Sequence, residues 1–131
     1  MVDVTAGKYF IQNKLNGFRL FYNDDREELG CFDGEMFEDQ LWFISKKSNG
    51  FYSIVRDRKH LCYDGCALSM TDVARENSLW VFEEDGDSKG FVRIINKVYN
   101  DNVFYAAEED ELNGSGDEND DQVWLLIRKS D

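Results

Sequence analysis

The chain has 131 residues, 42% of them hydrophobic and 15% aromatic, which is enough apolar side chain for one compact core but leaves no room for a second. Its 15 Lys and Arg against 27 Asp and Glu give a formal charge of −12, and a field of that sign disfavours nucleic acids and anionic membrane surfaces as partners. A neutral ligand, or a basic surface on another protein, suits this composition better.

The first predicted unit begins at Gly7. Residues 7–11 read Gly-Lys-Tyr-Phe-Ile, and after an Asn-Gly turn the alternating segment 18–22 predicts a second strand. Residues 39–44 read Asp-Gln-Leu-Trp-Phe-Ile, a polar pair followed by an apolar strand. The unit therefore reads as short strands joined by turns.

The same order of segments recurs twice further along the chain, with starts 43 and then 40 residues apart. The matching segments are 50–54, 60–63 and 77–82 in the second unit and 90–94, 103–105 and 121–126 in the third. Each unit opens on Gly-x-apolar-x-Ile and carries one Trp near its end, at Trp42, Trp80 and Trp124. Each reads as four short strands, and 70–77 has room for one helical turn.

A unit of this length cannot bury its apolar face alone, so the three copies must share one core. A propeller would need about four blades or more, whereas a threefold barrel capped by hairpins needs three units. We therefore predict an all-β protein, a single β-trefoil domain over 1–131 with repeats at approximately 7–46, 50–84 and 90–128. Its core is predicted to hold the three Trp residues together with Tyr9, Tyr52 and Val92.

The acidic segment 108–121 interrupts this pattern in the third unit. It is rich in Asp, Glu and Gly, and we expect a mobile loop there. The run Asp117–Asp121 has alternating oxygen side chains like the first half of a calcium loop, and Asp85–Gly90 is a weaker echo. Both lack the central Gly and the distal Glu of that motif, so we expect no metal site.

The motifs Gln40-Leu41-Trp42 and Gln122-Val123-Trp124 resemble the Gln-x-Trp repeat of the ricin B-type lectins, whose fold is a β-trefoil. The second unit departs from the pattern with Ser78-Leu79-Trp80. The resemblance covers residues 7–128 and implies a non-catalytic, carbohydrate-binding domain for a neutral, galactose-type glycan.

Members of that family hold sugar with an Asp after the second strand of a unit, an aromatic platform, and an Asn just before Gln-x-Trp. Aligning the units by their starts places Phe21, Asp64 and Ala106 at the Asp position. Repeat two keeps the acid and has Asn77, but offers only Met70 or Thr71 as a platform. Repeat one offers Phe32 as the platform and Asp39 in place of the Asn, and repeat three has Asp121 without a clear platform. The sugar-binding residues predicted from the resemblance are Asp64, Asn77, Phe32 and Asp39.

Two alternatives to this interpretation stay open. Asp64 and Asn77 are also typical turn residues, whose side chains bond nearby backbone amides. The protein is alternatively an interaction domain, a protease inhibitor or scaffold of trefoil type, that binds a basic partner through the acidic segment 108–121. Catalysis is not expected, because His60 is the single histidine and stands on a predicted surface or edge strand with no nucleophile pattern near it. No cofactor is implied.

The beginning of the chain, Met-Val-Asp-Val-Thr-Ala-Gly-Lys, lacks the basic and apolar stretches of a secretory signal, and no apolar run reaches the ~20 residues that span a bilayer. We expect a cytoplasmic location, unless a leader has been removed. Three cysteines do not make a disulfide framework, and Cys62 and Cys66, which flank a turn, are expected to be buried thiols.

Overall fold

The computed structural model describes residues 2–86, 90–117 and 119–129. Within them the chain is all-β, and the four helical elements found there are 3-10 turns of three residues each, so none is long enough to cross a membrane. The strands are β1 (Gly7–Asn13), β2 (Arg19–Asn23), β3 (Glu28–Phe32), β4 (Leu41–Lys46), β5 (Tyr52–Arg56), β6 (Lys59–Tyr63), β7 (Leu68–Thr71), β8 (Leu79–Glu84), β9 (Phe91–Asn96), β10 (Asn102–Ala106), β11 (Glu111–Ser115) and β12 (Trp124–Arg128). The 3-10 turns are η1 (Glu38–Gln40), η2 (Ser48–Gly50), η3 (Glu76–Ser78) and η4 (Asp120–Gln122).

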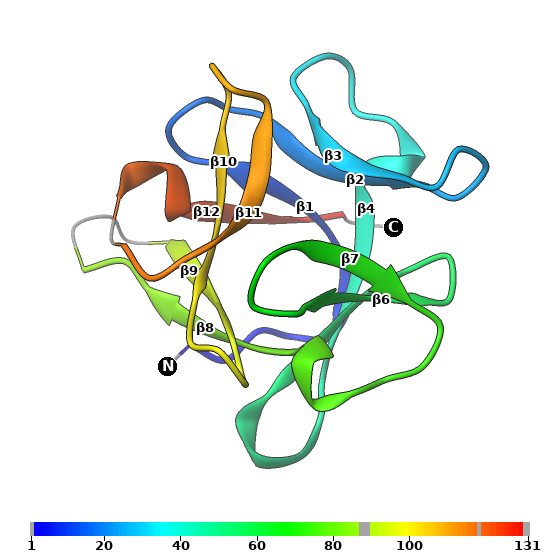
Figure 1. The fold of residues 1–131 in the computed structure, drawn as a ribbon, viewed down its shortest axis with the longest axis vertical. Helices are drawn as coiled ribbons and strands as arrows, with labels where there is room; N and C mark the ends of the chain where they lie inside the picture. Colours follow the sequence, from blue (N-terminus) through cyan, green and yellow to red (C-terminus); the bar gives the residue numbers. More distant parts are fainter. Residues whose placement is uncertain (1, 87–89, 118, 130–131) are drawn as a thin grey trace.

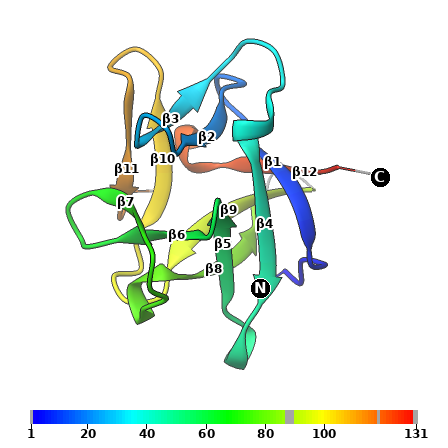
Figure 2. The same cartoon turned by 90° about the vertical axis from the view of Figure 1, so that its right-hand side faces the viewer.

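Six of the strands close into a barrel. The pairs β1–β4, β4–β5, β5–β8, β8–β9, β9–β12 and β12–β1 are all antiparallel, so the ring has no free edge. The other six strands form the hairpins β2–β3, β6–β7 and β10–β11, which are arranged around the barrel axis in Figure 1 and gather at one end of it in Figure 2. A barrel capped by three hairpins is the β-trefoil that the repeats predict.

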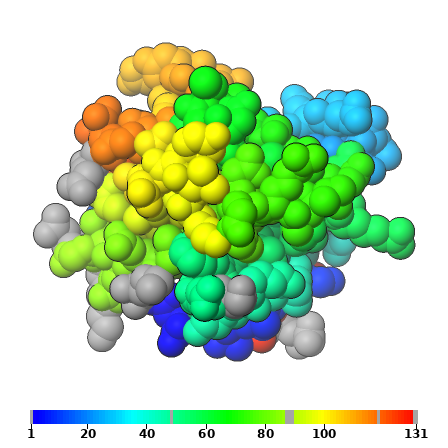
Figure 3. All heavy atoms as spheres, turned by 60° about the horizontal axis from the view of Figure 1, so that its bottom comes forward, coloured from blue at the N-terminus to red at the C-terminus, as the bar shows by residue number. Residues whose placement is uncertain are grey.

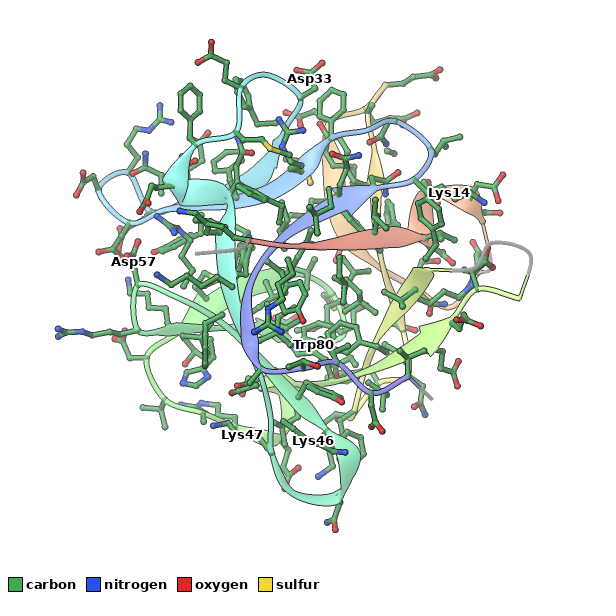
Figure 4. The ribbon with its side chains drawn as sticks, turned by 180° about the vertical axis from the view of Figure 1, so that it is seen from behind. Lys14, Asp33, Lys46, Lys47, Asp57 and Trp80 are labelled. Carbon is green, nitrogen blue, oxygen red and sulfur yellow. The ribbon has the colours of Figure 1, made fainter. Side chains whose placement is uncertain are left out.

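The centre of the fold repeats three times at the level of single hydrogen bonds. Trp42, Trp80 and Trp124 are at most 1% exposed, and Figure 4 shows Trp80 inside the ring of strands while Asp33, Asp57 and Lys14 lie at its periphery. A buried indole N–H needs an acceptor. The three Nε1 atoms donate to the carbonyl oxygens of Leu20, Leu61 and Val103 at 2.9, 3.0 and 2.9 Å.

The core residues predicted beside the Trp side chains are confirmed. Tyr9, Tyr52 and Val92 are between 1% and 6% exposed and belong to one cluster with the indoles. They lie on β1, β5 and β9, the opening strands of the three repeats, which is why their Gly-x-apolar-x-Ile motifs are alike. The three repeats thus agree where their side chains meet inside the barrel.

The prediction of a mobile loop over 108–121 is wrong for most of its length. Residues 111–115 form β11 and pair with the whole of β10, and 120–122 form η4, while residue 118 lies outside the described residues. Leu112 packs against the core opposite Tyr105 and anchors the strand. A Cβ at position 114 would lie 2.6 Å from the Tyr63 ring, so the glycine allows this ring to pack closely against β11. The acidic composition of the segment gives no sign that one apolar residue, Leu112, anchors it to the core.

Two smaller expectations are partly corrected. Of the residues from 70 to 77, the first two belong to β7, and a 3-10 turn begins at Glu76. Cys62 is buried as predicted, but Cys66 is exposed because it follows Gly65 at the tip of the β6–β7 hairpin. Cys31, Cys62 and Cys66 are all free thiols.

Candidate carbohydrate-binding site

The indole hydrogen bonds determine which residues of the three repeats are equivalent. Their acceptors, Leu20, Leu61 and Val103, occupy the same place, so the residue three positions later is Asn23 in repeat one, Asp64 in repeat two and Ala106 in repeat three. The predicted alignment of Phe21 with Asp64 is therefore wrong by two residues. The side chain at the acid position of repeat one is an amide, which binds hydroxyl groups well.

The error arises in the first hairpin of repeat two. Its β5–β6 turn consists of only Asp57 and Arg58, with φ angles of 51° and 66°, the left-handed geometry of a two-residue hairpin turn. Repeats one and three use longer turns, which the hydrogen bonds from Asn13 N to Phe18 O and from Asn96 N to Asp101 O close. A signal for this existed in the sequence, because residues 13–15 and 96–98 both read Asn-Lys-aliphatic.

Repeat one carries an open hollow of about 690 Å³ beside η1. Three elements supply its lining: the end of β2, the segment before β4, and the β5–β6 turn of the next repeat. The lining residues are Asn23, Asp24, Asp25, Phe37, Glu38, Asp39, Arg56, Asp57 and Arg58. The hollow is rich in carboxylates and has one aromatic wall, so it suits a polar, uncharged ligand better than an anion.

Several groups on this hollow are held by neighbouring residues. The Oδ1 of Asn23 accepts a hydrogen bond from the Arg26 amide at 3.2 Å, which fixes the side-chain amide at the edge of the hollow. Arg56 donates to the carbonyl oxygens of Tyr22 and Leu41 and is therefore fixed. A hydrogen bond from the Lys59 ammonium lowers the pKa of Asp24, so this carboxyl stays ionised.

The predicted residues Phe32 and Asp39 are brought together by the structure. Both line a smaller hollow of about 160 Å³ that shares Phe37 and Asp39 with the larger one. The rings of Phe32 and Phe37 lie 5.9 Å apart and are 40% and 49% exposed, an unusual exposure for two large apolar side chains in contact. Asp39 Oδ1 is buried and has no hydrogen-bond partner among the described residues. Two rings and a free acceptor therefore meet at one place.

Arg19 fixes the segment that carries these rings. It is 7% exposed, and its guanidinium donates to Gln40 Oε1 at 2.7 Å, to Gln12 Oε1 at 3.2 Å and to the carbonyl of Gly34. Gly34 lies in the connection 33–37, which is one residue longer than its equivalent 72–75 in repeat two. A buried cation with three acceptors holds this longer connection against the barrel.

In repeat two, Asp64 serves the turn that follows it. Its Oδ1 accepts hydrogen bonds from the amides of Cys66 and Ala67, both at 2.8 Å, and these bonds lower the pKa of the carboxyl. Asn77 has a buried Oδ1 without a partner, but neither residue lines the hollow of about 490 Å³ beside η3. The turn interpretation of Asp64 thus describes its contacts in this structure, and its role toward sugar stays a prediction.

An aromatic ring of repeat three lies next to the turn that follows Asp64 in repeat two. Tyr99, in the β9–β10 turn, packs on Gly65, where an added Cβ would lie 2.8 Å from its ring, and it meets Tyr63 edge-on at 5.5 Å. Figure 3 shows this yellow turn lying against the green atoms of repeat two. Such a contribution from a different repeat is invisible when each unit is read by itself.

Repeat three has a hollow of about 390 Å³ at the place equivalent to the large hollow of repeat one. Leu15 and Asn16 of repeat one form one wall, and Ala106 stands where the other repeats have Asn23 and Asp64. Asp121 has a buried, unpartnered Oδ1 like Asp39. Burial, followed by the charges of nearby carboxylates, raises its pKa. With a methyl group at the acid position, this repeat lacks the polar pair of repeat one.

Metal binding finds no support in the geometry that the structure describes. Across residues 2–86, 90–117 and 119–129, no group of three or more His, Cys, Asp or Glu side chains is placed to hold a metal ion. Residues 87–89 of the weaker calcium-like segment and residue 118 of the acidic one lie outside those ranges.

A β-trefoil with Gln-x-Trp motifs and a polar, aromatic-walled hollow beside one of them defines a lectin of the ricin B type. Over 129 residues the chain is 38% identical to a GM1b/asialo-GM1 oligosaccharide-binding R-type lectin of Mytilisepta virgata, with 98% of both chains covered, and it belongs to the R-type lectin family. No family model matches the chain.

Solved structures agree with this assignment. SeviL bound to asialo-GM1 saccharide is 37% identical and superimposes with a TM-score of 0.92 over 96% of this chain and 100% of that one. The ligand-free β-trefoil of BEL gives a TM-score of 0.86 at 14% identity, over 98% and 97% of the two chains, and so shows likeness of fold alone.

Proposed function

We propose that this protein is a non-catalytic lectin that binds a galactose-containing oligosaccharide in the hollow of repeat one. The relative from Mytilisepta virgata is described as binding GM1b and asialo-GM1 oligosaccharides, and SeviL was solved with the asialo-GM1 saccharide. The observation that carries the placement is the buried, unpartnered Oδ1 of Asp39 next to the exposed rings of Phe32 and Phe37. Repeat one combines a free acceptor with a ring platform.

The chemistry of a sugar matches these groups. A pyranose has an apolar face that covers an aromatic ring, and its hydroxyl groups both donate and accept hydrogen bonds. In the proposed complex Phe37 covers the apolar face, Asp39 accepts from one hydroxyl, and the Asn23 NH₂ donates to its neighbour. Arg56 closes the far wall and is held there by its two carbonyl partners, Tyr22 on β2 and Leu41 on β4.

Absence of catalysis is part of the proposal. Glycoside hydrolysis needs a carboxylic acid that stays protonated long enough to act as a general acid. In this hollow the pKa of Asp24 is shifted downward by Lys59, away from that role.

Calorimetric titration with asialo-GM1 oligosaccharide tests the site. Phe37→Ala and Asp39→Ala should each weaken binding by about tenfold or more, because each removes a contact worth roughly 1.4 kcal/mol or above. Phe43→Ala is the matched control, since Phe43 is a 45% exposed ring on β4 outside this hollow, and it should bind like the unaltered protein.

The same titration separates repeat one from the residues predicted in repeat two. Asp64→Ala and Asn77→Ala should leave the affinity within about twofold of the unaltered protein, a difference of roughly 0.4 kcal/mol. If these two variants abolish binding while Phe37→Ala and Asp39→Ala do not, the sugar site lies in repeat two and the placement in repeat one is wrong.

A further inference from the structure

The three repeats differ at the residue that ends each 3-10 turn before the Trp strand. Gln40 and Gln122 are fully buried, and each side chain reaches the second strand of its own repeat, where Gln40 Oε1 accepts from Arg19 and Gln122 Oε1 accepts from Asn102 at 3.5 Å. Ser78 occupies the same place in repeat two and is too short to do so. Its hydroxyl bonds only to the backbone of Arg75, 2.9 Å from its N and 2.7 Å from its O.

The shorter side chain leaves its opposite neighbour without a partner. His60 is equivalent to Arg19 and Asn102, and its Nδ1 is buried with no hydrogen bond to any described residue. The edge-strand part of the expectation for His60 is wrong, because β6 lies between β5 and β7 and His60 pairs with Val55 and Thr71. The residue as a whole is half-buried. An unpaired ring nitrogen is costly when buried, unless another group bonds to it.

A hollow of about 490 Å³ opens at this place, between the β4–β5 connection and η3. The side chains that the argument uses are Lys47, Ser53, His60, Arg75, Glu76 and Ser78. Lys47 follows the end of β4, and Figure 4 shows it next to Lys46 at that end of the barrel. Aromatic rings of Phe, Tyr or Trp are not among the lining residues, so the hollow offers no platform for the apolar face of a sugar.

This hollow is lined by two cations, Lys47 and Arg75, and one carboxylate, Glu76, in a chain whose net charge is −12. Neither the Lys47 ammonium nor the Arg75 guanidinium has an ion pair or side-chain hydrogen bond with a described residue. The carboxylate that lines the hollow, Glu76, is already paired with Lys97. Two free cations and an unpaired ring nitrogen therefore border one space.

We propose that this hollow binds a small oxyanion, a carboxylate or sulfate group, with Lys47 and Arg75 at its rim and His60 and Ser78 inside. Both cations attract the charge, and the imidazole of His60, whose Nδ1 has no partner among the described residues, is the remaining hydrogen-bond donor, because the Ser78 hydroxyl already donates to the Arg75 carbonyl oxygen. The volume of the hollow is many times the ~30 Å³ that one water molecule occupies in the liquid. It can therefore hold either a free oxyanion or an oxyanion that is part of a sugar acid. The site is independent of the proposed glycan site, which lies on another repeat.

Titration of the full chain by ¹⁵N–¹H NMR, at constant ionic strength set with chloride, tests the proposal. The probes are sodium sulfate for a free ion, glucuronate for an acidic sugar and glucose as the neutral control. Sulfate or glucuronate should shift the amides of 47, 60 and 74–79 in a saturable way, and glucose should not. A response to sulfate alone identifies a free ion as the ligand, and a response to glucuronate identifies a sugar acid.

Ser78→Gln is the decisive variant, because it fills the hollow without removing a charge. Gln122 shows that a glutamine fits, since its Oε1 accepts from the Asn119 amide just as Ser78 Oγ accepts from the Arg75 amide. The variant should fold at least as stably as the unaltered protein and bind the anion about tenfold more weakly or worse, and so should the double variant Lys47→Gln, Arg75→Gln. Lys8→Gln, which removes an exposed lysine elsewhere on β1, is the charge control and should bind normally.

Three results would overturn the proposal. The first is the absence of saturable shifts with both anions, which would mean that water alone fills the hollow. The second is an equal loss of binding in Lys8→Gln, which would mean that the anion responds to overall charge. The third is unchanged binding in Ser78→Gln, which would mean that the anion binds outside this hollow. Neither result bears on the asialo-GM1 titration, so this site and the proposed glycan site can fail separately.

Discussion

Repeat one and repeat two each bury one equivalent indole, Trp42 and Trp80, but carry different polar side chains near the 3-10 turn that precedes it. In repeat one, Arg19 and Gln40 bond to each other, and the same arginine holds the segment that carries the exposed rings. In repeat two, His60 Nδ1 has no partner among the described residues, and His60 and Ser78 line a hollow with unpaired cations. The indole hydrogen bonds are nevertheless the same length within 0.1 Å.

This difference shows that the residues that stabilise the fold are distinct from those that determine which ligands its surface can bind. The barrel requires the indoles and the apolar side chains around them, whereas the polar residues at the rim change from repeat to repeat without disturbing it. A duplicated fold can therefore carry an aromatic, acidic hollow on one repeat and a basic one on the next. The predictions below test that separation, starting with the largest expected effect.

Removing the indole of repeat one and removing that of repeat two should lower the stability of the protein by similar amounts. Trp42→Ala and Trp80→Ala should each lower the free energy of unfolding by about 3–5 kcal/mol, because the side chains are fully buried and leave large cavities. Urea unfolding followed by circular dichroism measures both. If one variant is close to the unaltered protein, the two indoles are not equivalent parts of one core and the comparison fails.

Arg19 and His60, which occupy equivalent positions, should contribute different amounts to the free energy of unfolding. Arg19→Ala removes three hydrogen bonds and leaves Gln40 Oε1 unpaired, which should cost about 2–3 kcal/mol. His60→Ala removes a ring whose buried nitrogen has no partner and should cost clearly less than Arg19→Ala in the same unfolding experiment. Equal costs would show that His60 has a partner in solution.

Asp64→Ala should destabilise the protein less than Arg19→Ala, and in a pH-dependent way. The amides of Cys66 and Ala67 lower the pKa of this carboxyl in the folded state, so its contribution is present above the unfolded value near 3.8 and is lost as the pH falls through the lower folded value. Melting temperatures at pH 7 should therefore differ between Asp64→Ala and the unaltered protein. Asp64→Asn, which keeps the acceptor, should lie between them.

Asp121→Asn should have the smallest effect and the opposite sign. Burial and the neighbouring carboxylates raise the pKa of Asp121 in the folded state, so the ionised form is disfavoured there and stability falls as the pH rises above the unfolded value of 3.8. The variant should melt slightly higher than the unaltered protein at pH 7, with the gain vanishing below about pH 3.8. A lower melting temperature at pH 7 would contradict this account of the carboxyl.

Much of the fold could be predicted because the three repeats carry it redundantly. A barrel position is occupied three times by similar apolar residues, so a period of about forty residues identified the trefoil, its repeats and its Trp core. The prediction for the acidic segment 108–121 is wrong for the opposite reason. Its pairing depends on Leu112 and Gly114, two positions that meet partners on β10 and β6, and average composition does not register such contacts.

The site was harder to predict because the repeats differ there and because neighbours contribute to it. A turn two residues shorter in repeat two moved Asn23 out of the alignment and put Phe21 in its place. Phe32 and Asp39 line one hollow, as their assignment to one repeat suggests, and their role toward sugar stays a prediction. Phe37 and Arg56 line the neighbouring hollow without being predicted from the sequence, and Arg56 belongs to a different repeat. The cytoplasmic location, the alternative of a basic protein partner, and a sugar-binding role for Asp64 and Asn77 stay predictions.

The central claim is that the sugar site lies on repeat one. Amide chemical shifts during titration with asialo-GM1 oligosaccharide locate the ligand directly on the chain. We expect the shifted amides to cluster at 23–26, 32–39 and 56–58, the three segments that border the proposed site. A cluster at 64–67 and 76–78, or no saturable shift at all, would contradict the account.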